Sequence, residues 1–175
     1  RTIKKQEEIK KTLTLNIATA ANKYANDFES FAQFLHNALN AYLNVGFCAL
    51  SLINNKNGQI ESIFVKDTVS KEIEEYVGGI EEYVVKSNKS LILNSKNIKK
   101  FSLENNIIIN NGHKEKTTSI LLTPLNIDGK TAGTITIKSF FANSQYEESD
   151  ADLMRFVATQ ITNILKQQKT AIAID

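Results

Sequence analysis

The chain has 175 residues, of which 42% are hydrophobic and 23% are charged, and its net charge at pH 7 is +2. This composition is that of a globular protein and excludes an intrinsically disordered chain, while the small net charge gives no sign of nucleic-acid binding. No apolar run approaches the roughly 20 residues needed to cross a bilayer, and the single cysteine excludes an internal disulfide. We therefore expect one domain in the cytoplasm, either alone or as part of a membrane-anchored protein.

Apolar residues recur at helical spacing over the first part of the chain. They are Ile9, Leu13, Ile17, Ala20, Tyr24, Phe28, Phe31, Leu35, Ala38, Leu39 and Tyr42. The pattern fits one very long helix or two helices that meet near Asn26 and Asp27. Asn26 followed by Glu29 has the form of a capping box, which favours a break, and we predict helices over 3–24 and 27–43.

Residues 1–26 are basic, with six positive and two negative side chains and so a net charge of +4. A membrane surface or a nucleic acid could use such a segment. A solvated helix face, with Glu7 paired to Lys11 one turn later, is the simpler explanation. We therefore expect neither a membrane nor a nucleic acid as a partner of this chain.

The middle of the chain alternates between strand and helix patterns. Apolar runs at 46–53 and 59–66 are joined by Asn57-Gly58, a strong hairpin signal. Residues 70–87 return to helical spacing, and 90–94 form a brief strand. Residues 95–116 have no clear periodicity and are interpreted as a long loop, of a kind that often covers a binding site.

The last third of the chain predicts one more hairpin and one more helix. Strands over 117–126 and 130–141 are closed by Asp128-Gly129. Ser149 followed by Asp152 marks the start of the final helix. Hairpins in place of alternating strand–helix units predict an antiparallel sheet with helices packed against it, an α+β fold.

Three segments resemble the GAF domains of bacterial sensor proteins. Residues 79–93 (GIEEYVVKSNKSLIL) are similar to the helix-to-strand passage in the middle of these domains. Residues 118–125 (TSILLTPL), followed by 133–137 (GTITI), resemble the family's strand pair with its proline, and 146–161 (YEESDADLMRFVATQI) resembles the opening of its last helix. With 27–66, the resemblance covers about 27–168, which leaves 1–26 as a helical extension and 169–175 as a helical linker.

The resemblance implies an antiparallel sheet with the first and last helices on one face. The other face, the middle helix and the long loop would form a small-molecule pocket. It also implies a non-catalytic sensory or regulatory module of the sensor histidine kinase type, with the kinase or cyclase domain outside this chain. A structural coupling module without a ligand, and a small enzyme of the same fold, remain alternatives.

The flanking helices of such domains pair subunits, so the resemblance implies a homodimer formed through the terminal helices. Ile9, Leu13 and Ile17 would extend an apolar stripe beyond the domain. A second stripe with three-four spacing follows at the other end of the chain, at Ile161, Leu165, Gln168 and Ile172.

The reactive residue types give no catalytic or metal-binding pattern. Cys48 lies in a predicted strand and is followed by Ala49, whereas the cysteine that attaches a bilin in the family is commonly followed by histidine. Relatives that reduce free methionine sulfoxide depend on several cysteines. His36 and His113 are isolated from other ligand residues. We therefore expect no enzyme activity and no metal, bilin or haem.

The second hairpin suggests where a ligand would lie. With a two-residue turn, Thr123 would oppose Thr134 and Leu121 would oppose Thr136, which makes one face hydroxyl-bearing. Ile120, Leu122, Ile135 and Ile137 would form the opposite, helix-packed face. A hydroxyl-bearing face beneath a loop suits a ligand pocket, although threonine is also a good strand former that can face water. The predicted pocket residues are Ala49, Ser51, Tyr76, Tyr83, Phe101, His113, Ser119, Leu121, Thr123, Thr134 and Thr136.

Overall fold

The computed structural model describes residues 2–67, 79–109, 117–142 and 145–174. Its centre is an antiparallel sheet of five strands in the order β2-β1-β5-β4-β3, which confirms the predicted α+β fold. The strands are β1 (Phe47–Ile53), β2 (Ile60–Asp67), β3 (Leu91–Asn94), β4 (Ser119–Ile127) and β5 (Lys130–Ser139).

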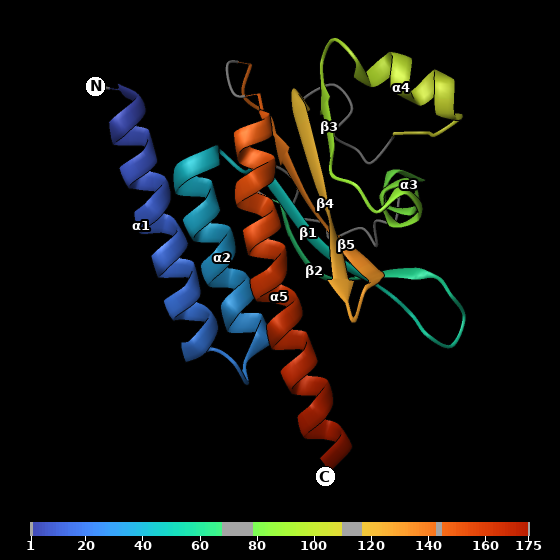
Figure 1. Cartoon of the computed structure of the whole chain (residues 1–175). Coiled ribbons are helices and arrows are strands. Elements are labelled where there is room, and N and C mark those ends of the chain that lie inside the picture. The colour runs from blue at the N-terminus through green and yellow to red at the C-terminus, as the bar shows by residue number, and fades with distance from the viewer. Residues whose placement is uncertain (1, 68–78, 110–116, 143–144, 175) are drawn as a thin grey trace.

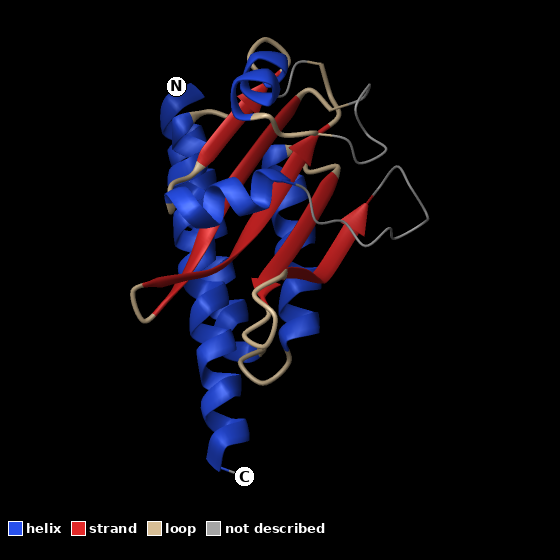
Figure 2. Cartoon of the chain, turned by 90° about the vertical axis from the view of Figure 1, so that its right-hand side faces the viewer, coloured by secondary structure: helices blue, strands red, loops and turns tan. Residues whose placement is uncertain are grey.

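Helices cover both faces of this sheet. Three of them, α1 (Thr2–Lys23), α2 (Phe28–Leu43) and α5 (Glu148–Ile174), lie side by side on one face (Figure 1). On the other face lie α3 (Gly79–Ser87) and α4 (Ile98–Asn105), and α3 crosses in front of the strands in Figure 2. None of the described helices is both long enough and apolar enough to span a bilayer.

The break between the first two helices is confirmed, but its cap is not the predicted one. Asp27, rather than Asn26, caps α2: its Oδ1 accepts a hydrogen bond from the Ser30 amide at 3.1 Å, and its Oδ2 accepts one from the Ser30 hydroxyl at 2.5 Å. Such a bond satisfies one of the free amides in the first turn of the helix. The same two bonds lower the pKa of Asp27.

The main core lies between the sheet and the three-helix layer. Ile17 of α1, Leu39 of α2 and Ile161 of α5 are fully buried there. The expectation that Leu13 and Ile17 extend an apolar stripe beyond the domain is therefore wrong. Because α1 folds back against both α2 and α5, these two side chains belong to the chain's own core, whereas Ile9 remains 45% exposed.

The second hairpin has the predicted turn but a different register. Asp128 and Gly129 both have positive φ, 52° and 79°, as a two-residue hairpin turn requires. Two residues beyond the turn the pairing shifts: Asn126 pairs with Thr131, but Leu125 pairs with Gly133. Ala132 is thus the extra residue of a β-bulge.

This bulge reverses the two faces of β4. Leu121 opposes Ile137 and Thr123 opposes Ile135, so both lie on the side of the three-helix layer. Ile120 and Leu122 instead pack beneath α3. The predicted pairings of Thr123 with Thr134 and of Leu121 with Thr136 are wrong, because a one-residue shift moves each side chain to the opposite face.

A smaller apolar cluster lies under α3 and α4. It joins Ile80 and Val84 of α3 to Leu93, Ile120 and Leu122 of the sheet. The predicted loop over 95–116 contains α4, so that prediction is wrong for residues 98–105. This helix buries none of its side chains fully, which explains why its sequence lacks a strong apolar stripe.

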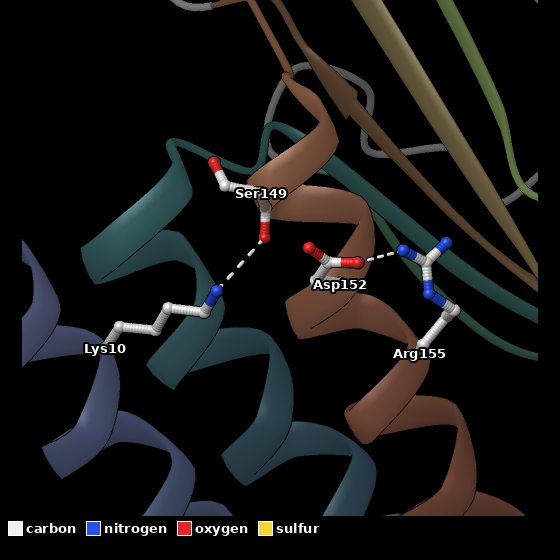
Figure 3. Close-up of polar contacts among 4 residues, drawn as sticks. All are labelled: Lys10, Ser149, Asp152 and Arg155. Atoms are coloured by element: carbon white, nitrogen blue, oxygen red, sulfur yellow. Dashed lines mark hydrogen bonds and ion pairs between the residues drawn. The ribbon is translucent and has the colours of Figure 1, made fainter.

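The two remaining predicted helices, over 70–87 and from Ser149, are observed in part and with a different cap, respectively. Of the predicted helix over 70–87, residues 79–87 are observed as α3, and residues 70–78 lie outside the described part of the chain. The last helix begins at Glu148, and its first turn is stabilised by Asp150, whose Oδ2 accepts a hydrogen bond from the Glu147 amide at 2.8 Å. The predicted capping partner, Asp152, instead pairs with Arg155 (Figure 3).

Candidate functional site

The face of the sheet beneath α3 brings four predicted pocket residues together. Ala49 of β1 pairs with Thr136 of β5, and Ser51 pairs with Thr134. All four are buried. The Thr136 hydroxyl donates a hydrogen bond to Glu81 Oε1 of α3 at 3.4 Å, which fixes these residues on the α3 side of the sheet.

Two charged residues are buried beside these hydroxyls. Glu81 is 1% exposed, and Lys138, two residues after Thr136 on the same face of β5, is 0% exposed. The Lys138 ammonium lies 4.7 Å from the centroid of the Phe47 ring, a distance at which a cation and an aromatic ring attract each other. Lysine and glutamate are rarely fully buried in proteins, so a buried residue of each type between α3 and the sheet is unusual.

We call these residues the α3-side polar patch. It consists of Ser51, Glu81, Thr134, Thr136 and Lys138. Within it, Thr134 is fully buried and its hydroxyl has no hydrogen-bond partner in the described part of the chain. Buried hydroxyls are nearly always hydrogen-bonded in folded proteins, so Thr134 offers a donor and an acceptor to an occupant of this face.

Sequence reasoning missed the two charged members of the patch. Lys138 follows Thr134 and Thr136 at the strand period of two, so the pattern could have placed it on the same face. Glu81 is one of five glutamates in residues 70–87, and nothing in the sequence distinguishes it from the others.

Three predicted pocket residues lie elsewhere, on the other face of β4. Leu121 and Thr123 face the three-helix layer because of the bulge at Ala132. The Ser119 hydroxyl donates a hydrogen bond to the Leu93 carbonyl at 3.2 Å and accepts one from the Tyr146 amide at 3.0 Å. Ser119 therefore links β3 and β4 to the segment that leads into α5.

The predicted aromatic residues are only partly described. Tyr83 of α3 and Phe101 of α4 are in contact, with ring centroids 5.0 Å apart and an interplanar angle of 84°. This edge-to-face contact joins the two helices on the outer side of the sheet. Tyr76 and His113 lie outside the described residues.

The only cysteine is not placed for catalysis. Cys48 is 1% exposed on the face of the three-helix layer, away from the α3-side polar patch, and burial raises the pKa of its thiol to about 12. A thiol must ionise to act as a nucleophile or a metal ligand. Among the residues that the structure describes, no group of three or more His, Cys, Asp and Glu side chains is placed to hold a metal ion.

These features define an α+β fold, with a helical layer on one face of an antiparallel sheet and a short helix over a polar patch on the other. The chain belongs to the GAF domain family, whose match spans residues 27–165. No protein with curated function matches its sequence.

Several solved structures share the fold. The GAF domain of a protein described as a sensor histidine kinase from Pseudomonas syringae pv. tomato is 12% identical, with a TM-score of 0.67 and a match over 99% of this chain and 98% of that one. The GAF domain of an Acinetobacter phosphoenolpyruvate-protein phosphotransferase is 14% identical, with a TM-score of 0.62 and coverage of 97% and 96%. The free methionine-R-sulfoxide reductase of Neisseria meningitidis, solved with its substrate, is 11% identical, with a TM-score of 0.67 and coverage of 95% and 91%.

Proposed function

We propose that this chain is a non-catalytic sensory module of a larger bacterial signal-transduction protein and that it binds a small polar molecule between α3 and the sheet. The observation that carries the proposal is the α3-side polar patch. A buried lysine, a buried glutamate and an unpartnered threonine hydroxyl lie on a face that otherwise packs apolar side chains.

The chemistry of the patch defines the class of ligand. Lys138 can attract an anionic group, Glu81 can accept hydrogen bonds from a cationic or hydroxyl group, and Thr134 can do either. These groups have already lost their contact with water, so a ligand that exchanges bonds with them requires little further desolvation. A small molecule that carries at least one charged group fits best.

Catalysis is disfavoured by the position of Cys48. One structural neighbour is a methionine sulfoxide reductase, and a thiol chemistry on this fold would need a reactive cysteine near the ligand. Here the only thiol is buried on the opposite face of the sheet and its pKa is raised to about 12. Its thiolate would be scarce at neutral pH.

Pairing of two copies through the terminal helices forms the second part of the proposal. A largely apolar groove of about 700 Å³ runs between α1 and α2, with Ile9, Leu13 and Phe34 among its lining residues. An apolar groove on a surface helix favours association with a second helix. The same groove supports the alternative of a coupling module that dimerises without a ligand.

A thermal-shift screen separates these two functions of the domain. Purified chain is heated with a library of small charged metabolites, in parallel with a Thr134→Leu variant that fills the site of the unpartnered hydroxyl. The sensory proposal predicts compounds that raise the melting temperature of the wild type and leave the variant unchanged. Thr131→Leu, on the same strand but near the turn, is the matched control and should respond like the wild type. Compounds that stabilise all three proteins equally, or a library without any stabilising compound, would favour the coupling module.

A further inference from the structure

A cleft lies on the side of the sheet that carries α5. It has a volume of about 550 Å³ and is lined by three groups of residues: 88–90 in the turn between α3 and β3, Thr123, Pro124 and Asn126 on β4, and a stripe of α5 between Glu148 and Thr162. None of its lining residues belongs to the α3-side polar patch. The proposed function does not use it.

The floor of this cleft is an open strand edge. The pairing of β3 with β4 ends at Leu91 and Leu122, so β4 has no pairing with β3 from Thr123 onward. Pro124 lies in this stretch, and proline has no amide to donate to an added strand. An extended peptide would therefore find an incomplete template here. The cleft is better suited to a small molecule that side chains hold.

Two hydroxyl groups in the cleft lack partners. Thr123 is 1% exposed, and its Oγ1 makes no hydrogen bond in the described part of the chain. The Ser90 Oγ is also buried and has no partner there. The two residues come from different elements, yet both line the same cleft. Buried hydroxyls without partners are rare, so two in one cleft indicate an occupant with hydroxyl or other polar groups.

The two cationic residues of the cleft favour an anionic group. Lys89 and Arg155 both line it. Arg155 bonds to Asp152 through one guanidinium nitrogen, Nη2, and a guanidinium has five N–H donors in all. Figure 3 shows Arg155 on the opposite side of α5 from Lys10, with its guanidinium directed away from α1. Glu148, the one acidic lining residue, is seven residues earlier, or about 10 Å along the helix.

We propose that this cleft is a second ligand site, which binds a small hydroxylated anion. The anionic group lies at Lys89 and Arg155, and hydroxyl groups of the ligand satisfy Ser90 and Thr123. Phosphate and carboxylate are both suitable anions, because each accepts hydrogen bonds from guanidinium and ammonium groups. The bound molecule would link α5 to β4 and to the turn before β3.

The test is an NMR titration of the ¹⁵N-labelled chain with glycerol 3-phosphate, glycerate and glycerol. Glycerol 3-phosphate tests the phosphate, glycerate tests the carboxylate, and glycerol is the neutral match of both. We expect at least one of the two anions, added to about 10 mM, to shift amide signals of residues 88–90, 123–126 and 155–162. Glycerol should leave these signals unchanged.

Four variants locate the binding. Arg155→Gln should raise the Kd about tenfold, because it removes a charge-assisted bond, and Lys89→Gln should raise it by a smaller factor. Thr123→Val keeps the side-chain shape, so it should weaken binding without lowering stability. Glu148→Gln removes a like charge and should leave binding unchanged or tighten it.

Three results would overturn the proposal. The first is the absence of shifts with both anions, which would mean that water fills the cleft. The second is an equal response to glycerol, which would remove the role of the anion. The third is binding that neither Lys89→Gln nor Arg155→Gln weakens, which would place the anion elsewhere on the surface.

Discussion

His36 should limit the stability of this domain in mild acid. It lies on α2 with 3% of its surface exposed, and neither ring nitrogen has a hydrogen-bond partner in the described part of the chain. Burial lowers the pKa of His36 below its usual value of 6.5, and the positive charge of Lys66 on β2 lowers it further. The folded protein therefore holds a neutral imidazole without partners.

The free-energy effect of replacing His36 has two parts. A buried polar group without a partner costs about 1–3 kcal/mol, so His36→Leu should raise the free energy of unfolding by an amount in that range at pH 8. The second part depends on pH. Because the folded pKa is lowered, the unfolded chain takes up a proton first as the pH falls below 6.5. The wild type should then lose up to about 1.4 kcal/mol per pH unit through this residue.

Urea unfolding at pH 8 and pH 5.5, followed by far-UV circular dichroism, measures both parts. The free energy of unfolding of His36→Leu should exceed that of the wild type by more at pH 5.5 than at pH 8, since the variant lacks the titrating group. Asn37→Leu is the matched control: it adds the same side chain at the neighbouring exposed position and should keep the pH dependence of the wild type. An equal advantage of His36→Leu at both pH values, or a variant less stable than the wild type, would refute the reasoning.

Three further predictions follow from the sheet. Gly133→Ala should destabilise the protein by roughly 1–3 kcal/mol, since a Cβ there would overlap the Ser51 carbonyl oxygen. Urea unfolding equal to that of the wild type would mean that the backbones of β1 and β5 do not approach each other so closely at Gly133. Leu121→Ala should cost about 2–5 kcal/mol because Leu121 is a core residue, and a cost below this range would favour the register without a bulge. Cys48 should react with a thiol reagent only after unfolding, and rapid labelling of the native chain would contradict its burial and raised pKa.

Much of the fold follows from local sequence signals. Asp128-Gly129 determines its hairpin because both residues adopt the positive φ that the turn requires. The first hairpin also forms at its Asn-Gly pair, but there only Gly58 has a positive φ, of 72°, and the connection spans residues 54–59. The stripes of apolar residues give α1, α2 and α5 within two residues at the ends that the prediction specified, because each of these helices buries one apolar face in the main core.

The faces of β4 could not be derived in this way. They depend on a bulge at Ala132, next to Gly133, where β1 and β5 approach too closely for any side chain. That approach is a tertiary contact between strands about eighty residues apart in sequence, and no local pattern encodes it. The error moved Ser119, Leu121 and Thr123 into the predicted pocket. Glu81 was missed for a similar reason, since only packing distinguishes it from its neighbouring glutamates.

The central claim is that the α3-side polar patch binds a small charged molecule, and native mass spectrometry tests it even while the ligand is unidentified. The wild type and Thr134→Leu are each incubated with the dialysable fraction of a bacterial extract and then analysed under non-denaturing conditions. We expect a discrete added mass on the wild type that is absent from Thr134→Leu and retained by Thr131→Leu. A wild type that carries no added mass, or an added mass that Thr134→Leu retains in full, would contradict the claim.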